Sequence, residues 1–182
     1  LFELTSLFGA RLPVEALHET NASNTACLRH MSRTFCLPIA YFDAVEPTAP
    51  KELTAGGSGC WLPTNPHYNA ADTGPLAVDG NWSVVLRGSA STVTVPVNLT
   101  DPVYQPPPAE QIFVRQGGVR APPLFAVRSF GRGRVALFNS WRQYTLGGGR
   151  KWLFDDQVLR SGAEGRPSDL GQLLTNTLRW LA

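Results

Sequence analysis

The clearest pattern of apolar and polar positions lies in the last third of the chain. Segments 125–131 and 134–139 alternate apolar and polar residues about the turn Gly131-Arg132-Gly133, which predicts a β-hairpin. Glycines suit such a turn because they adopt positive φ at little steric cost. The residues expected to share one face of the hairpin are Phe125, Val127, Val135 and Leu137.

An amphipathic helix is predicted from Leu170 to Trp180. Ser168 is the expected N-cap, and Asp169 stands where the positive end of a helix favours an acid. The leucines that recur at helical spacing are Leu170, Leu173, Leu174, Leu178 and Leu181. Their face must be buried, so the hairpin and the closing helix together indicate an α/β fold.

Three further strands are expected upstream. Segment 35–42 reads as a short buried strand bent by Pro38. Segments 82–87 and 91–97 read as two strands about a glycine turn, and the second is an edge strand because Pro96 cannot donate to a ladder.

The ends of the chain and one long segment define its organisation. Residues 1–8 predict a short helix that stops at Gly9. Residues 46–80 are rich in proline and glycine and read as a long ordered loop or insertion. Because the chain begins and ends inside predicted helices, we expect residues 1–182 to be a single domain, or a fragment of one, from a larger protein.

Composition excludes several classes of function. The 182 residues are 43% hydrophobic and carry a formal net charge of +2, which suits a folded domain and gives little support to nucleic-acid binding beyond the local patch Arg128, Arg132 and Arg134. The sequence has no apolar run of the roughly 18 residues that a membrane span needs. It also lacks a phosphate-binding glycine loop, and no cofactor is predicted.

Cysteines and glycosylation motifs favour a secreted or otherwise extracytoplasmic protein. A disulfide between Cys27 and Cys36 would leave Cys60 free or bonded elsewhere. The three Asn-x-Ser/Thr acceptors begin at Asn21, Asn81 and Asn98, where about one is expected by chance. Zinc and free thiols are the alternatives for the cysteines, but only Cys27 and His30 have the spacing of paired zinc ligands, so no metal site is predicted.

The sequence also resembles a known family. The motif PLFAVRSFGRGRVALF at 123–138 and the ending NTLRWLA at 176–182 resemble the C-terminal half of class I glutamine-amidotransferase-like domains, above all their non-catalytic relatives in large multidomain proteins. The resemblance implies a flavodoxin-like three-layer α/β fold, incomplete at its N-terminus, with a C-terminal hairpin and closing helix.

The residues that catalysis would need in that family are not recognisable. Catalytic members use a cysteine nucleophile at a strand-to-helix elbow and a His-x-Glu pair after the hairpin, because a thiolate needs an imidazole base and the imidazole an orienting acid. Here residues 139–145 hold neither histidine nor glutamate, and no cysteine lies in a Gly-x-Cys-x-Gly elbow, although Cys60 does follow a glycine run. The Asp155-Asp156 pair reads as solvated loop acids rather than as a catalytic pair.

A polar and aromatic run after the hairpin is the candidate binding site. It lies where the last strand ends, which is where open α/β sheets bind ligands. The candidate ligand-binding residues are Asn139, Ser140, Trp141, Arg142, Tyr144 and Arg150. The alternative is that the aromatic residues of this run only pack the last helix against the sheet.

The sequence therefore predicts a non-catalytic binding or structural domain of a larger extracytoplasmic protein. It would contact the rest of the parent chain, another protein or a carbohydrate through the 139–152 loop. One alternative is a hydrolase for carbohydrate or peptide, in which Trp141, Arg142 and Tyr144 bind substrate and Cys60, His67 or an upstream segment supplies catalysis. The other is an architectural subunit of a complex.

Overall fold

The computed structural model describes residues 2–13, 15–30, 35–43, 46, 48–64, 73–96, 118–140 and 156–182. Within them the chain contains both strands and helices, which confirms the predicted α/β class, and its strands form several short antiparallel sheets. The main sheet contains β7 (Ser83–Arg87), β9 (Pro123–Phe130) and β10 (Gly133–Phe138) in the order β10-β9-β7. A second sheet contains β3 (Thr25–His30), β4 (Phe35–Phe42) and β5 (Cys60–Pro63).

The described ranges also contain two smaller, two-stranded sheets. They pair β1 (Ala10–Arg11) with β6 (Ala77–Val78), and β2 (Glu15–Glu19) with β8 (Thr92–Pro96). Every strand pair in the described part of the chain is antiparallel. A flavodoxin-like sheet is mainly parallel. The described strands include no parallel pair, so the predicted flavodoxin-like fold is not confirmed and stays a prediction.

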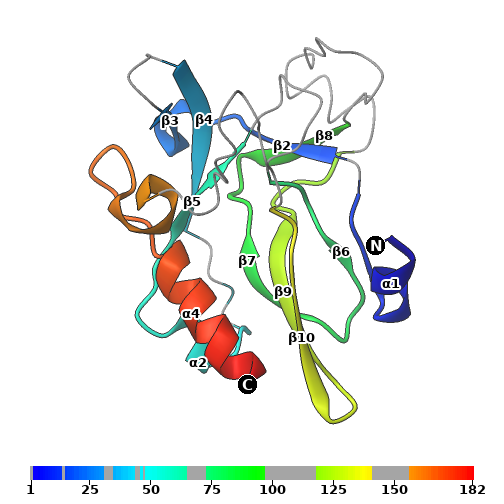
Figure 1. The fold of residues 1–182 in the computed structure, drawn as a ribbon. Helices are drawn as coiled ribbons and strands as arrows, with labels where there is room; N and C mark the ends of the chain where they lie inside the picture. The colour runs from blue at the N-terminus through cyan, green and yellow to red at the C-terminus, as the bar shows by residue number, and fades with distance from the viewer. Residues whose placement is uncertain are drawn as a thin grey trace.

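The helices lie on both sides of the main sheet. They are α1 (Phe2–Leu7), α2 (Lys51–Thr54) and α4 (Leu170–Leu181), with the 3₁₀ turn η1 (Ala22–Asn24) and the π-helical turn η3 (Gln157–Ser161). In Figure 1, β9 and β10 run between α4 on one side and β6 with α1 on the other. The predicted helices at both ends of the chain and the strand at 35–42 are confirmed.

The hairpin is confirmed, but its predicted face is wrong. The loop consists of Gly131 and Arg132 alone, because Gly133 already pairs with Phe130. The register then places Phe125 opposite Phe138 and Leu137 opposite Ala126. Phe125 and Val127 therefore share their face with Ala136 and Phe138, and Val135 and Leu137 lie on the opposite face, since a shift of one residue moves every side chain across a sheet.

Ser168 does not cap the last helix as predicted. The N-cap position belongs to Asp169. The Ser168 hydroxyl donates instead to the Val158 carbonyl and accepts the backbone N–H of Trp61 at 3.1 Å. Ser168 thereby joins the start of α4 to β5 and η3 in the interior.

The larger apolar core lies between the two three-stranded sheets and α4. Trp61, Phe42 and Leu170 are all fully buried there. Trp61 belongs to the segment that was expected to be a loop, and its indole N–H donates to the Arg166 carbonyl at 2.9 Å. The proline- and glycine-rich segment thus supplies both α2 and a buried strand to the core.

A smaller cluster covers the opposite face of the main sheet. Trp82, Ala126, Val135 and Leu137 pack there, and the Trp82 indole donates to the Phe8 carbonyl at 2.7 Å. Gly9 ends α1 as predicted, with φ of +70°. The main sheet is therefore covered on both faces, with α4 on one and the N-terminal segment on the other.

Candidate functional site

The structure describes only the beginning of the predicted binding loop. Asn139 is buried, and its side-chain amide donates to the Pro75 carbonyl at 2.8 Å. Ser140 is also buried, and its hydroxyl lies 3.2 Å from that of Thr73. The Asn139 carbonyl in turn accepts the Gly74 N–H at 2.8 Å. These two polar residues fasten segment 73–75 to the end of β10.

The remaining candidates of this loop lie outside the described residues. They are Trp141, Arg142, Tyr144 and Arg150. Their role in binding stays a prediction. Asn139 and Ser140 have a structural explanation for their polarity, because each bonds to a segment that is more than 60 positions away in sequence.

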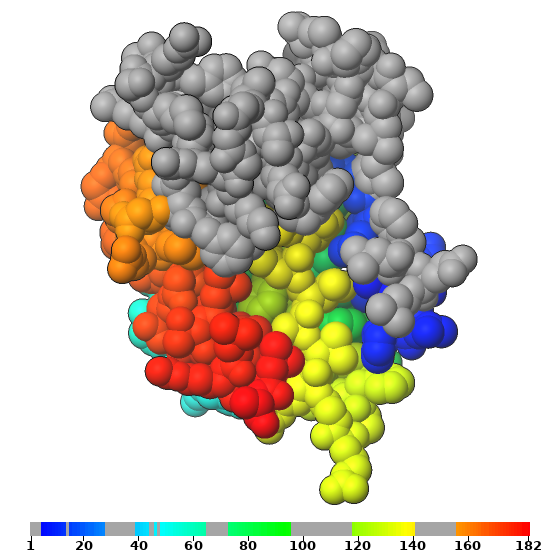
Figure 2. Space-filling view, in the orientation of Figure 1, coloured from blue at the N-terminus to red at the C-terminus, as the bar shows by residue number. Residues whose placement is uncertain are grey.

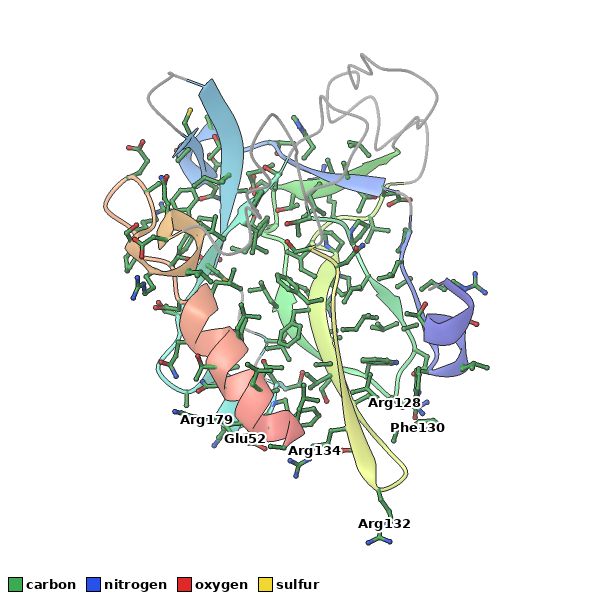
Figure 3. The ribbon with its side chains drawn as sticks, viewed as in Figure 1. Glu52, Arg128, Phe130, Arg132, Arg134 and Arg179 are labelled. Atoms are coloured by element: carbon green, nitrogen blue, oxygen red, sulfur yellow. The ribbon has the colours of Figure 1, made fainter. Side chains whose placement is uncertain are left out.

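Arginines gather at one end of the molecule. Figure 3 shows Arg128, Arg132 and Arg134 of the hairpin at the same end as Arg179 of α4. The hairpin loop projects from this end in the space-filling view (Figure 2). We call this surface the arginine end and define it by these exposed residues: Phe130, Arg132, Arg134, Leu178, Arg179 and Leu181.

Two of the hairpin arginines are held in place by the fold. The Arg134 guanidinium donates to the Trp180 carbonyl and lies 5.2 Å from the centre of the Trp180 ring. Arg128 donates to the Phe8 carbonyl at 2.6 Å and lies 5.3 Å from the Phe130 ring. Its Nη1 is 3.8 Å from the carboxylate of Asp79.

In the described part of the chain, no ion pair compensates the positive charge of Arg132, Arg134 or Arg179. Arg87, Arg128 and Arg160 form ion pairs with described residues. Arg132, Arg134 and Arg179 are exposed and are not among them. The sequence pointed to the hairpin arginines, but the contribution of α4 was not predicted because Arg179 is 45 positions from Arg134 and reaches this end only through the packing of α4 on β10.

Cys60 is a free cysteine, and its thiol lies in the core. It is 3% exposed, and burial, with a further contribution from the negative charge of Asp169, raises its pKa to about 12. The thiol is therefore protonated at neutral pH, and the thiolate is the nucleophilic form. This geometry gives no support to Cys60 as the catalytic group of a hydrolase. His67 lies outside the described residues.

Asp169 organises the glycine-rich turn before Cys60. Its carboxylate accepts the backbone N–H of Ser58 at 2.7 Å, the Ser58 hydroxyl at 3.0 Å and the N–H of Gly59 at 3.3 Å. Burial raises the pKa of Asp169, but these hydrogen bonds outweigh it and lower the pKa below its usual value. These three hydrogen bonds hold the turn against the start of α4.

A small cavity lies beside this turn. Its volume is about 20 Å³, and its walls come from α2, β7 and α4, including Leu53, Val85, Leu86, Leu173 and Asn176. Ligand pockets usually occupy about 300–1,000 Å³. The space suits at most a single water molecule.

The predicted modification sites that are described lie at the surface. Asn21 and Asn81 are both exposed, and the Asn21 side-chain oxygen accepts the Ser23 N–H at 3.0 Å. Cys27 is exposed on β3 and disulfide-bonded. Its backbone lies opposite Pro38, two positions from Cys36 on β4. The Cys36 side chain and the whole of Asn98 lie outside the description.

Among the described residues, no group of three or more His, Cys, Asp or Glu side chains is placed to hold a metal ion. In the same part of the chain, no helix is long and apolar enough to cross a membrane.

The fold and the surface define an α/β domain with an arginine-rich, partly apolar end. The chain matches no family model, no curated protein and no solved structure. The resemblance to amidotransferase-like domains stays a prediction from the motifs at 123–138 and 176–182.

Proposed function

We propose that this chain is a non-catalytic binding or structural domain of a larger extracytoplasmic protein, with the frame of an amidotransferase-like, flavodoxin-like relative. Its contacts are made with another polypeptide, either the rest of the parent chain or a partner protein. Two surfaces make these contacts: the arginine end and the predicted 139–152 loop.

The observation that carries the proposal is the composition and order of the arginine end. Arginine and aromatic residues are enriched at protein interfaces. Arg134 is ordered by Trp180 before any partner binds, so less side-chain entropy is lost on binding. Phe130 and Leu178 add apolar area, since they are 47% and 69% exposed. A partner surface with carboxylates and apolar side chains complements this end.

The lysines of the chain offer a direct test. Only two are present, Lys51 and Lys151. Lys51 precedes Glu52, which lies at the arginine end in Figure 3, and Lys151 belongs to the predicted loop. Amine cross-linking of the full-length parent protein, read by mass spectrometry, is expected to link Lys51 or Lys151 to residues outside this domain.

A charge-reversal variant makes the test specific to the arginine end. Arg132→Glu with Arg134→Glu should reduce the links formed by Lys51. Arg160→Glu is the control, because Arg160 lies on η3 and pairs with Asp156. If neither lysine links beyond the domain, the contact proposal is wrong.

The absence of catalysis is tested separately. The Cys60→Ser variant and the wild-type domain are compared for hydrolysis of glutamine, model esters and glycosides. Equal rates at the level of the buffer blank support the proposal, because a thiol with a pKa near 12 supplies almost no thiolate. Turnover that disappears in the Cys60→Ser variant would establish the hydrolase alternative.

The extracytoplasmic assignment rests on the exposed acceptors and on Cys27. Both Asn21 and Asn81 can be reached by a transferase, and the ladder brings Cys27 and Cys36 to neighbouring strands. We expect intact-mass analysis of native material to show glycan on at least one asparagine and a loss of two hydrogens for a Cys27–Cys36 bridge. A bare chain with three free thiols would contradict the assignment.

A further inference from the structure

Two arginines attach the hairpin to the C-terminal ends of two helices. Arg128 and Arg134 point to opposite faces of the sheet, because Arg128 pairs with the residue after Arg134. Arg128 Nη1 donates to the carbonyl of Phe8, the residue after α1. Arg134 Nη1 donates to the carbonyl of Trp180 in the last turn of α4. Carbonyls at a helix C-terminus lack a partner within the helix, and cationic side chains can satisfy them.

Arg134 keeps one edge of its guanidinium group open. Its Nη1 is used by the Trp180 carbonyl, and its Cζ lies over the Trp180 ring at 5.2 Å from the centre. The Nε–H and the neighbouring Nη2–H, which we call the Arg134 fork, point along the same edge of the plane. The side chain is exposed, and no described residue bonds to the fork. Two parallel N–H donors on one edge match the two oxygens of a carboxylate.

The other two fixed arginines of the chain do not offer this edge. Arg128 has a buried Nε. Arg160 uses its Nε and Nη2 to bind the Asp156 carboxylate, at 2.9 and 2.6 Å. Arg160 therefore shows the expected contact within the same chain, and among the described acids none makes it with Arg134.

The charge around the Arg134 fork is positive. Arg132 and Arg179 are exposed at the same end, and neither forms an ion pair with a described residue. Figure 3 shows Glu52 of α2 at this end as well. These three arginines against one glutamate leave an excess of two positive charges. A field of this sign attracts an anionic ligand and speeds its approach.

The apolar side chains of the arginine end favour a polypeptide over other anions. Phe130 and Leu178 are 47% and 69% exposed, and burying them against apolar side chains is favourable. A sulfated sugar or a phosphate has no such side chains. A lipid bilayer would have to admit the projecting hairpin loop first (Figure 2), and that loop contains Arg132, whose charge is costly to bury in lipid.

We propose that the Arg134 fork binds a glutamate or aspartate side chain from an acidic, partly apolar segment of the partner polypeptide. This site rests on the proposed function, in which the arginine end contacts a polypeptide, and it identifies the chemical group that makes the contact. Trp180 orients the guanidinium before binding, which lowers the entropy lost on binding. Arg132 and Arg179 steer the acidic segment toward the site.

The arginine Nε–H signals in the nuclear magnetic resonance spectrum of the ¹⁵N-labelled chain test the site directly. The probe is a short peptide of alternating glutamate and leucine with blocked ends. The Arg134 signal, identified by its loss in Arg134→Lys, should move and saturate with a Kd of roughly 0.1–1 mM, because one bidentate pair makes most of the contact. The same peptide with glutamine in place of glutamate should not move it. The Arg160 signal is the control in the same sample, because Asp156 already occupies its fork.

Lysine variants separate the fork from simple charge. Arg134→Lys keeps the positive charge but loses the two parallel donors. Its affinity for the glutamate peptide, followed on the backbone signals of the hairpin, should fall by about 10-fold, the effect of losing a charged hydrogen bond. Arg160→Lys is the matched control and should leave the affinity unchanged. Circular dichroism checks the fold of both variants.

Three results would overturn the site. They are an Arg134 signal that ignores the glutamate peptide, equal affinities of wild type and Arg134→Lys, and tighter binding of a heparin oligosaccharide than of the peptide. The last result would assign the arginine end to a sulfated glycan. Failure of the proposed function is distinguishable from these results, because cross-links from Lys51 beyond the domain would persist in the parent protein even if no carboxylate binds Arg134.

Discussion

Replacing Asn176 with leucine tests the link between α2 and α4. The Asn176 side chain is 7% exposed, and its amide donates to the carbonyls of Leu53 and Ala55, both at 3.0 Å. Its oxygen accepts the Gln172 amide at 2.8 Å. Leucine has a similar size but neither donor, so both carbonyls at the end of α2 would lose their partner.

The expected cost follows from the burial of those carbonyls. A buried acceptor without a partner costs about 1–3 kcal/mol. The bond to Leu53 is buried, and the bond to Ala55 is only partly buried, so water can replace that donor in part. The added apolar surface of leucine offsets about 1 kcal/mol. We expect the free energy of unfolding to fall by about 2 kcal/mol, which for this length lowers Tm by roughly 4–8 °C.

Urea unfolding followed by tryptophan fluorescence measures this change, with thermal unfolding as a second readout. Thr175→Ala is the matched control, because Thr175 neighbours Asn176 but is exposed and bonds only within α4. Its expected cost is below about 0.5 kcal/mol. If Asn176→Leu falls within that range too, the hydrogen bonds to α2 do not stabilise the fold and the reasoning is refuted.

Two further predictions concern the turn before Cys60 and the end of α1. Asp169→Asn should lower the free energy of unfolding by about 1 kcal/mol at neutral pH. Hydrogen bonds lower the pKa of Asp169 in the folded state. The stabilisation by its carboxylate is therefore fully present above the unfolded pKa near 4 and is lost as pH falls through the folded pKa. The difference between wild type and variant in urea unfolding should therefore shrink from pH 6 to pH 3, and a constant difference would contradict this account. Gly9→Ala should destabilise more than Gly56→Ala by about 1 kcal/mol or more in thermal unfolding, because both glycines have positive φ but only a Cβ at Gly9 would overlap the carboxylate of Asp79. Equal losses would show that the space around Gly9 does not matter.

Sequence patterns predicted α4 and β4 well, because the spacing of apolar residues within each segment is enough to identify it. The leucine spacing found α4 to within one residue of its observed end at Leu181, and the apolar run at 35–42 gave β4 with its observed bounds. The hairpin register was missed because a loop of two residues and a loop of three fit the same glycines. Only the observed pairing of Phe130 with Gly133 decides between them.

The candidate site was harder to predict because its residues act through distant partners. Asn139 and Ser140 followed a strand and suggested a ligand site, but their partners come from segment 73–75. Ser168 had the local features of an N-cap, yet its hydroxyl bonds to Trp61, 107 positions away. Single-sequence patterns contain no information on such pairs.

The segment from Arg166 to Asp169 has a consequence for cooperativity. It bonds to Trp61 through both the backbone and the indole, and to the turn at Ser58. A helix of 12 residues such as α4 is marginal on its own in water, so its stability depends on this attachment to β5. The C-terminal helix and the second sheet should therefore open and close together as one unit rather than by fraying from the chain end.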